Sequence, residues 1–158
     1  MGFIRPGWDE YYLEIARTAA SRSNCLRRQV GAIIVCNHAI VSTGYNGTPM
    51  GVTNCFEGGC ARCSSDAESG AGYDTCICVH AEQNAIVLAA RRGNSVAGGT
   101  LYTTLRPCFG CLKESIQAGI AKIVFGEAAS YPPALEDVYQ DLVAQTSLEL
   151  EALEPNRR

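Results

Sequence analysis

The chain has 158 residues, 47% of them hydrophobic, and a formal net charge of −3. This composition suits one globular domain over residues 1–158 and excludes a broad basic surface for a long nucleic acid. No run approaches the roughly 20 apolar residues of a membrane span, and the first residues lack the apolar region of a secretory signal. We therefore expect a cytoplasmic protein without a membrane partner.

The first half of the chain predicts one helix followed by a β-hairpin. Residues 8–21 carry apolar side chains at helical spacing, and two β-branched runs follow at 30–35 and 39–45. Asn37 lies between these runs and suits a tight hairpin turn. Residues 46–75 are rich in Gly, Cys, Ser and Asp, and a loop of that length is uncommon in a compact domain unless something holds it in place.

The second half alternates between helices and strands. Helices are predicted at 80–92, 108–118 and 133–145, and strands at 100–105, 122–126 and, as a last edge strand, 148–153. Such alternation implies parallel pairing with right-handed crossovers. The sequence therefore predicts an α/β fold: a three-layer α/β/α sandwich around a mixed sheet of about five strands, opened by the antiparallel hairpin.

The nine cysteines indicate metal ligation. Seven of them lie between Cys55 and Cys111, and the chain begins without an export signal. Cytosolic thiols are kept reduced, so a disulfide framework is not expected. Cys36 lies in an apolar strand and is interpreted as a core residue.

Two short motifs carry the chemistry. His80 and Glu82 belong to "HAEQNA", and Cys108 and Cys111 belong to "RPCFGCLK". His80 and Cys108 each stand at a predicted helix start, and residues three apart share one helix face. One imidazole and two thiolates with an open fourth position form the ligand set of a catalytic zinc, which supplies a nucleophile by lowering the pKa of its bound water.

Glu82 is two residues past His80 and is predicted to lie in the same pocket without ligating the metal. There it would transfer the proton of water to the substrate and then to the departing amine. Each motif alone is more often a surface histidine or a structural cysteine pair. Joined as H-x-E and P-C-x-x-C, they form the signature of zinc-dependent deaminases.

The sequence resembles the deoxycytidylate (dCMP) deaminase family of the cytidine deaminase-like superfamily, from Trp8 to about Tyr131. The matching stretches include "RSNCLRRQVGAIIV", "STGYNGTPMGVTNC", "HAEQNAI" and "GGTLYTTLRPCFGCLKESIQAGIAKIVF". The resemblance implies hydrolysis of dCMP to dUMP and ammonia, in a homo-oligomer regulated by dCTP and dTTP. The family's catalytic residues correspond to His80, Glu82, Cys108 and Cys111.

The resemblance also implies substrate contacts. An asparagine at the end of the second strand touches the sugar in this superfamily, and Asn46 occupies that place; the alternative is that Asn46 only adopts a left-handed turn. Tyr131 belongs to the last matching stretch and is included as a substrate-binding residue. Arg28, beside Arg22 and Arg27, and Arg106, beside the predicted zinc site, are the candidates for reading a phosphate group.

The cysteine-rich insert at about residues 50–78 is similar to that of family members with a second, structural zinc. The ligands that the resemblance implies are Cys25, Cys55, Cys60 and Cys76, with Cys63 and Cys78 as rivals for the last two. Since Cys76 and Cys78 form a Cys-x-Cys pair, we choose only one of them. The sequence thus predicts one catalytic and one structural zinc ion.

Other substrates remain open from the sequence. Deaminases of dCTP, CMP or deoxycytidine share the zinc motifs, as does a tRNA adenosine deaminase, which the mild acidity of the chain disfavours. A noncatalytic zinc module is a further alternative, and the presence of Glu82 argues against it.

Overall fold

A computed structural model of the chain describes residues 4–68 and 70–153. Its strands form one sheet in the order β2-β1-β3-β4-β5. Strand β1 pairs antiparallel with both β2 and β3, whereas β3 with β4 and β4 with β5 are parallel. The predicted mixed sheet is confirmed. The strands are β1 (Gly31–Cys36), β2 (Ala39–Tyr45), β3 (Thr100–Leu105), β4 (Lys122–Glu127) and β5 (Glu149–Ala152).

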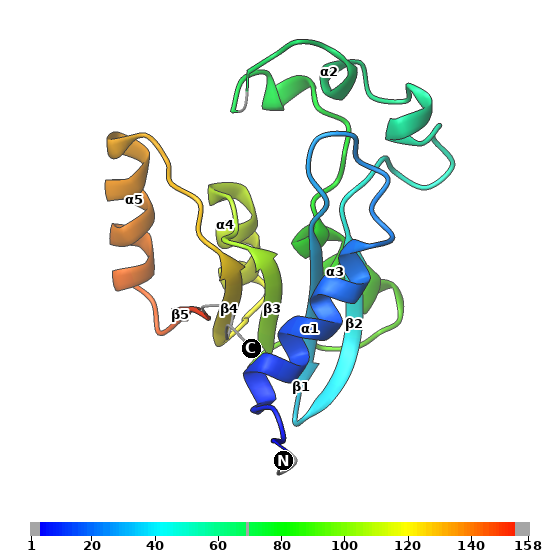
Figure 1. Cartoon of the computed structure of the whole chain (residues 1–158). Coiled ribbons are helices and arrows are strands. Elements are labelled where there is room, and N and C mark those ends of the chain that lie inside the picture. Colours follow the sequence, from blue (N-terminus) through cyan, green and yellow to red (C-terminus); the bar gives the residue numbers. More distant parts are fainter. Residues whose placement is uncertain (1–3, 69, 154–158) are drawn as a thin grey trace.

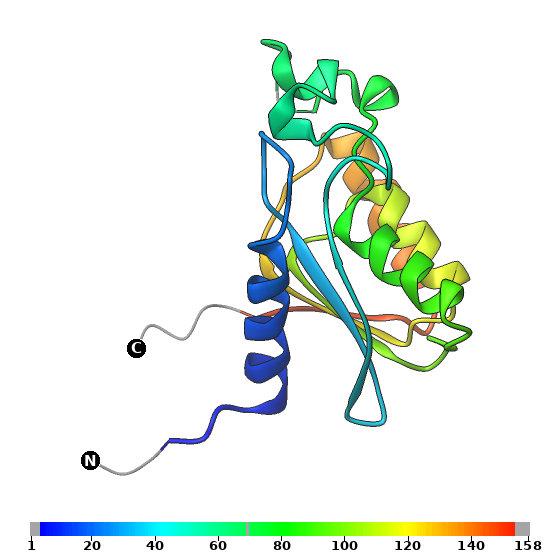
Figure 2. The same cartoon turned by 90° about the vertical axis from the view of Figure 1, so that its right-hand side faces the viewer.

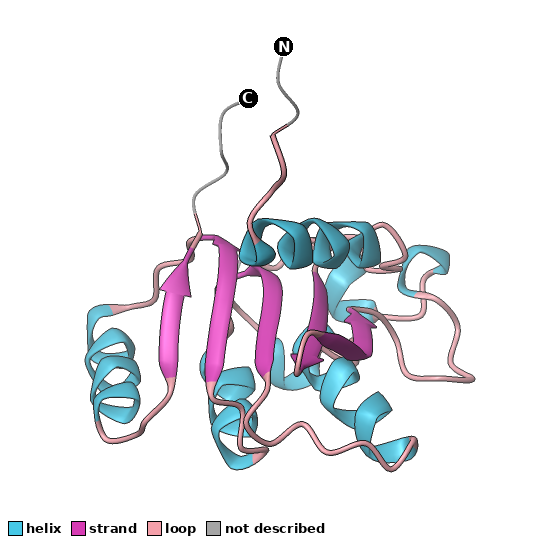
Figure 3. Ribbon diagram, turned by 90° about the horizontal axis from the view of Figure 1, so that it is seen from below, coloured by secondary structure: helices cyan, strands magenta, loops and turns pink. Residues whose placement is uncertain are grey.

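Helices cover both faces of this sheet, as the three-layer prediction requires. Helix α1 lies on one face, and α3, α4 and α5 lie on the other (Figures 1 and 3). The bounds of the predicted helices and strands agree with the structure to within one residue at each end. The helices are α1 (Trp8–Ala20), α2 (Ala61–Ser64), α3 (Ala81–Arg91), α4 (Phe109–Gln117) and α5 (Pro133–Ala144).

Alternation along β1 explains the two-sided core. Ala32 and Ile34 pack into the cluster shared with α3 and α4, whereas Ile33 and Val35 pack against α1. Successive strand residues point to opposite faces, so a strand covered on both sides is apolar at nearly every position. The run "GAIIV" therefore belongs to a strand inside the sheet, between β2 and β3.

The turn between β1 and β2 has the geometry that its two residues favour. Asn37 and His38 both adopt positive φ angles, 49° and 62°. A two-residue hairpin loop of this kind matches the right-handed twist of the strands, and asparagine tolerates the left-handed region better than most residues. The predicted tight turn at Asn37 is confirmed.

Two glycines let helices approach the hairpin closely. A Cβ atom on Gly44 would lie 2.1 Å from the carbonyl oxygen of Ala81, the first residue of α3. A Cβ atom on Gly31 would lie 2.1 Å from the carbonyl oxygen of Ala16 in α1. Both strands thus accept a helix backbone only because these positions carry no side chain. The contact at Gly44 fixes where α3 begins.

The cysteine-rich insert folds into short turns instead of an unstructured loop. It contains helix α2 and two 3₁₀ turns, η1 (Cys55–Glu57) and η2 (Tyr73–Thr75), which helical or strand periodicity did not predict. Figure 2 shows the insert beyond one end of the sheet, next to the loop that follows α1. Among the described residues, no helix combines the length and apolar character that a membrane crossing requires.

We expect Gly44→Ala to destabilise the protein, because the new methyl group forces α3 away from β2. Overpacking of this kind lowers the free energy of unfolding by about 1–3 kcal/mol. For a chain of this size the melting temperature then falls by roughly 2–12 °C. Thermal and urea unfolding measure the change. Gly7→Ala is the control, since its nearest neighbouring atom lies 3.9 Å away; equal melting temperatures for the two variants would contradict the packing argument.

Candidate active site

The starts of α3 and α4 converge at one end of the sheet. Helix α3 begins one residue after His80, and α4 begins one residue after Cys108, so each is the N-cap residue of its helix. The backbone amide of Cys111 donates to the Cys108 sulfur over 3.5 Å. The Gln83 side chain accepts the His80 amide proton over 2.9 Å. Local helix-start chemistry therefore orients both ligand-bearing residues.

The structure brings His80, Cys108 and Cys111 together. The Nδ1 atom of His80 lies 3.4 Å from the sulfur of Cys108 and 3.4 Å from the sulfur of Cys111. Zinc–sulfur bonds of about 2.3 Å and zinc–nitrogen bonds of about 2.0 Å at tetrahedral angles place such atoms roughly 3.6 Å apart. The three donor atoms thus fit one zinc ion, and Nδ1 is the nitrogen of His80 that faces the two sulfurs.

Glu82 lies beside this triad and is buried from solvent. One carboxylate oxygen is 3.6 Å from the sulfur of Cys111, and the other is 3.5 Å from the hydroxyl of Thr103 on β3. Only 4% of Glu82 is exposed. Thr103 was not singled out from the sequence, although alternation in β3 places it on the same face as Leu101, which packs under α3.

Burial and hydrogen bonds shift the pKa values of the triad residues and of Glu82 in different directions. Hydrogen bonds from Cys111, with help from His80, lower the pKa of Cys108 to about 4. The contact with Cys108 and burial raise the pKa of Cys111. Burial raises the pKa of Glu82, and the Cys108 sulfur raises the pKa of His80. Cys108 is thus a thiolate at neutral pH, which is the form that binds zinc.

Two tyrosines hold the start of α4. The hydroxyl groups of Tyr131 and Tyr139 donate to the carbonyl oxygen of Pro107 over 3.0 and 3.2 Å. Their rings stack with centroids 5.8 Å apart. The structure therefore gives Tyr131 a supporting role next to Cys108 of the triad. The substrate contact expected for Tyr131 stays a prediction.

The guanidinium of Arg106 pairs with groups of the protein that the sequence did not predict. It was expected to read a phosphate group, but its guanidinium makes two hydrogen bonds to Glu136, of 2.7 and 2.9 Å, and a third to the carbonyl of Ala129. It also lies over the ring of Tyr139 and is 9% exposed. The guanidinium lowers the pKa of Glu136 to about 2. Arg106 therefore attaches α5, and the sequence could not reveal a partner thirty positions away. The phosphate contact expected for Arg106 stays a prediction.

Asn46 joins the segment before β1 to the end of β2. Its Oδ1 accepts hydrogen bonds from the Ser23 hydroxyl and the Val30 amide, and its Nδ2 donates to the carbonyl of Arg28 over 2.7 Å. The left-handed turn considered for Asn46 is wrong, since among the described residues other than glycine only Asn37 and His38 have positive φ. The expected sugar contact stays a prediction.

Arg28 is the more available of the predicted phosphate ligands. It lines a groove with residues from the ends of β3 and β4, and its side chain is 56% exposed. Its one ion pair, to Glu127 over 3.2 Å, joins two exposed groups and is weak. The neighbouring Arg27 instead donates to the carbonyl oxygens of Cys63 and Ser65.

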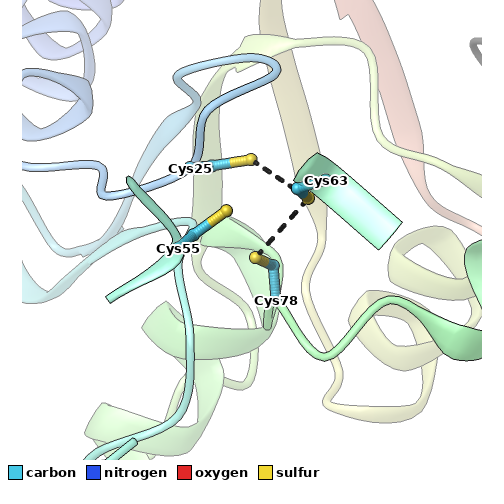
Figure 4. Close-up of side chains that lie close together, drawn as sticks. All are labelled: Cys25, Cys55, Cys63 and Cys78. Carbon is cyan, nitrogen blue, oxygen red and sulfur yellow. Dashed lines mark hydrogen bonds between the residues drawn. The ribbon is translucent and has the colours of Figure 1, made fainter. Parts of the chain in front are cut away.

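The predicted ligands of the structural zinc do not form one group. Cys25 and Cys55 lie with Cys63 and Cys78, as Figure 4 shows. Cys60 and Cys76 also lie with Cys63 and Cys78, so each predicted pair belongs to a different group. The correction has two parts. The two residues treated as rivals are common to both groups, and the Cys-x-Cys pair contributes both of its sulfurs.

The comparisons with known proteins agree with this geometry. Residues 6–127 match the model of the cytidine and deoxycytidylate deaminase zinc-binding region. Deoxycytidylate deaminase of Schizosaccharomyces pombe is 47% identical over 77% of this chain, and that of Saccharomyces cerevisiae is 46% identical over 79%. The chain spans only 38% and 39% of the length of these two relatives.

A solved structure is similar along its whole length. The dCMP deaminase of cyanophage S-TIM5, crystallised with dCMP and dUMP, is 34% identical, with a TM-score of 0.73. The match covers 96% of this chain and 100% of the phage chain. The family match spans the sheet as far as β4 together with the His80, Cys108 and Cys111 triad, and this chain belongs to the cytidine and deoxycytidylate deaminase zinc-binding family.

Proposed function

We propose that the protein catalyses the zinc-dependent hydrolytic deamination of dCMP to dUMP and ammonia. The observation that carries the proposal is the buried carboxylate of Glu82, 3.6 Å from the sulfur of Cys111 in the His80–Cys108–Cys111 triad. A structural zinc site has no need of a buried acid–base group beside it. The similarity to deoxycytidylate deaminases supports the choice of substrate.

We propose that His80, Cys108 and Cys111 hold the catalytic zinc and that the cysteine-rich insert is a structural zinc site. Zinc in a site with three protein ligands and an open position activates water at neutral pH. The donor set supports this choice, because thiolate and imidazole are the ligands that zinc prefers. Two helix N-termini face the site, and their dipoles stabilise negative charge there.

Glu82 is the proposed proton carrier. Its carboxylate takes a proton from the attacking water and delivers it to N3 of the cytosine ring as the new C4–O bond forms. The proton of the new C4 hydroxyl group then passes through the same carboxyl group to the amine, the C4–N bond breaks as the C4=O bond forms, and ammonia leaves. Burial raises the pKa of Glu82, which makes the group a better base than an exposed carboxylate.

The nucleotide specificity is the finer part of the proposal. Arg28 is exposed in its groove, and its backbone carbonyl is bound by Asn46, whose neighbour Gly47 pairs with Val79 directly before His80. Arg28 is therefore placed by the same backbone that places a zinc ligand. We propose that Arg28 binds the 5′-phosphate and that Asn46 contacts the sugar.

The resemblance extends the proposal to assembly and regulation. We propose a cytoplasmic homo-oligomer that responds to dCTP and dTTP. Zinc ligation needs the thiols of the insert and the triad in their reduced form. The cytoplasm keeps thiols reduced, which supports a cytoplasmic location. Size-exclusion chromatography with and without each nucleotide tests the assembly.

Glu82→Gln should retain zinc and fold, and its kcat should fall at least 10²–10⁴-fold, because the amide cannot carry the proton. Steady-state deamination kinetics and zinc analysis measure the two effects. Glu149→Gln, an exposed position on β5, is the control and should keep full activity. Turnover of Glu82→Gln within tenfold of the wild type would remove Glu82 from the mechanism. Loss of zinc in that variant would instead identify it as a ligand.

Among cytidine, deoxycytidine, CMP, dCMP and dCTP, we expect the highest kcat/KM for dCMP. It should exceed that of deoxycytidine by at least tenfold, because one charge-assisted hydrogen bond contributes about 1.5–3 kcal/mol. Steady-state measurement of kcat/KM for the five compounds identifies the preferred substrate. Equal values for dCMP and deoxycytidine would indicate a nucleoside deaminase, and a preference for dCTP would change the assigned nucleotide.

Arg28→Ala should reduce this dCMP preference while leaving kcat/KM for deoxycytidine unchanged. The backbone carbonyl that Asn46 binds is kept in the variant, so the fold of the segment is retained. Arg91→Ala, at the end of α3, serves as the matched control. An equal loss for both substrates would show a structural effect and reject phosphate binding by Arg28.

A further inference from the structure

Six cysteines of the insert and its surroundings form a cluster apart from the catalytic triad. They come from the segment before β1, from η1 and α2, and from the stretch that leads into α3, and together they make a separate buried cluster. None of them belongs to the His80, Cys108 and Cys111 group. The six are Cys25, Cys55, Cys60, Cys63, Cys76 and Cys78.

The sulfur–sulfur distances are those of metal thiolates. The Cys63 sulfur lies 3.9 Å from Cys25, 3.8 Å from Cys76 and 4.0 Å from Cys78, and Cys60 lies 3.9 Å from Cys76. Sulfurs bound to one tetrahedral zinc are about 3.8 Å apart, whereas a disulfide bond is about 2.05 Å long. All six cysteines are free. The cluster is thus arranged for metal ions and not for disulfide bonds.

The two groups of four share Cys63 and Cys78. One group is completed by Cys25 and Cys55, and the other by Cys60 and Cys76. In Figure 4 the Cys63 sulfur lies between those of Cys25 and Cys78. A thiolate sulfur has enough lone pairs to bind two metal ions. Six sulfurs with two of them shared complete two tetrahedral sites, and no sulfur is left over.

We propose that the insert binds a binuclear zinc–thiolate cluster bridged by Cys63 and Cys78. Cys25 and Cys55 complete the coordination of one zinc ion, and Cys60 and Cys76 complete that of the other. This assignment goes beyond the single structural zinc that the family resemblance implies. It is also independent of the proposed deamination, because no cluster cysteine lies in the triad.

The formal charge of the cluster is the same with two zinc ions as with one. Two zinc ions with six thiolates, or one zinc ion with four thiolates and two thiols, both carry a formal charge of about −2. The second ion therefore adds bonds without adding buried charge. Arg27 donates to the carbonyl of Cys63 over 2.9 Å, and the buried Arg62 precedes Cys63 in α2. The Arg27 guanidinium therefore offsets part of the negative charge of the cluster. The Arg62 guanidinium instead donates to the carbonyl oxygens of Glu68 and Ala71.

A backbone amide reaches one sulfur from outside the cluster. The amide of Leu26 donates to the Cys55 sulfur over 3.4 Å. Amide donors of this kind stabilise thiolates, the form in which cysteine ligates zinc.

The test is zinc stoichiometry by native mass spectrometry, after the reduced full-length protein is loaded with zinc and excess metal is removed. We expect about three zinc ions per chain, one in the triad and two in the cluster. Cys108→Ser should lower the count by one, which accounts for the catalytic ion separately. A wild-type content of about two ions would overturn the binuclear assignment, whether or not the protein deaminates dCMP.

Single substitutions distinguish bridging from terminal ligands. Cys60→Ser should lose one zinc ion and Cys63→Ser should lose two, while Cys36→Ser, outside the cluster, should lose none. Where a variant fails to fold, the wild-type protein loaded with ¹¹³Cd provides the second measurement. Its NMR spectrum should show two sulfur-only cadmium signals coupled to each other through the bridging thiolates. One such signal, or two without coupling, would reject the bridged cluster.

Discussion

The pairing of two backbone segments at Gly47 and Val79 positions most of what surrounds the active site. Each residue donates its amide to the carbonyl of the other, over 3.1 and 2.8 Å, in an isolated antiparallel bridge. The bridge joins the exit of the hairpin to the exit of the cysteine-rich insert. His80 follows directly, so the first residue of the triad is placed by hydrogen bonds of the main chain, and its side chain is not needed for that placement.

Close packing completes this positioning. The carbonyl of Ala81 occupies the space that a side chain at Gly44 would fill. This contact sets the distance between the start of α3 and β2. On the other side of the site, Tyr131 and Tyr139 hold Pro107, and the Gln83 side chain donates to Glu114 to join α3 to α4. The two ligand-bearing helix starts are thus connected to the sheet and to each other. Such support keeps ligands within the narrow tolerance of a tetrahedral metal site.

The sequence predicted the sheet, its helices and the composition of the triad because each has a local signal. Hydrophobic periodicity marks the strands, and the H-x-E and P-C-x-x-C motifs mark the helix starts. The arrangement of the other cysteines has no such signal. The turns around Cys55, Cys63 and Cys76 are too short for periodicity, so the sequence could not tell which sulfurs meet. The pairing of Arg106 with Glu136 was hidden for a related reason, since an exposed arginine and one paired to a distant residue look the same in sequence.

The family match ends at residue 127, yet the support of the active site extends past it. Glu136 and Tyr139 both belong to α5 and reach back to Arg106 and Pro107. A fragment that stopped with β4 would leave the guanidinium of Arg106 without its counter-ion and the Pro107 carbonyl without either phenol donor. Arg106 is buried, so removal of Glu136 would leave its charge uncompensated, which is destabilising. The structural boundary of the unit that supports the His80, Cys108 and Cys111 triad therefore lies beyond α5, and a shortened version of this chain must include that helix.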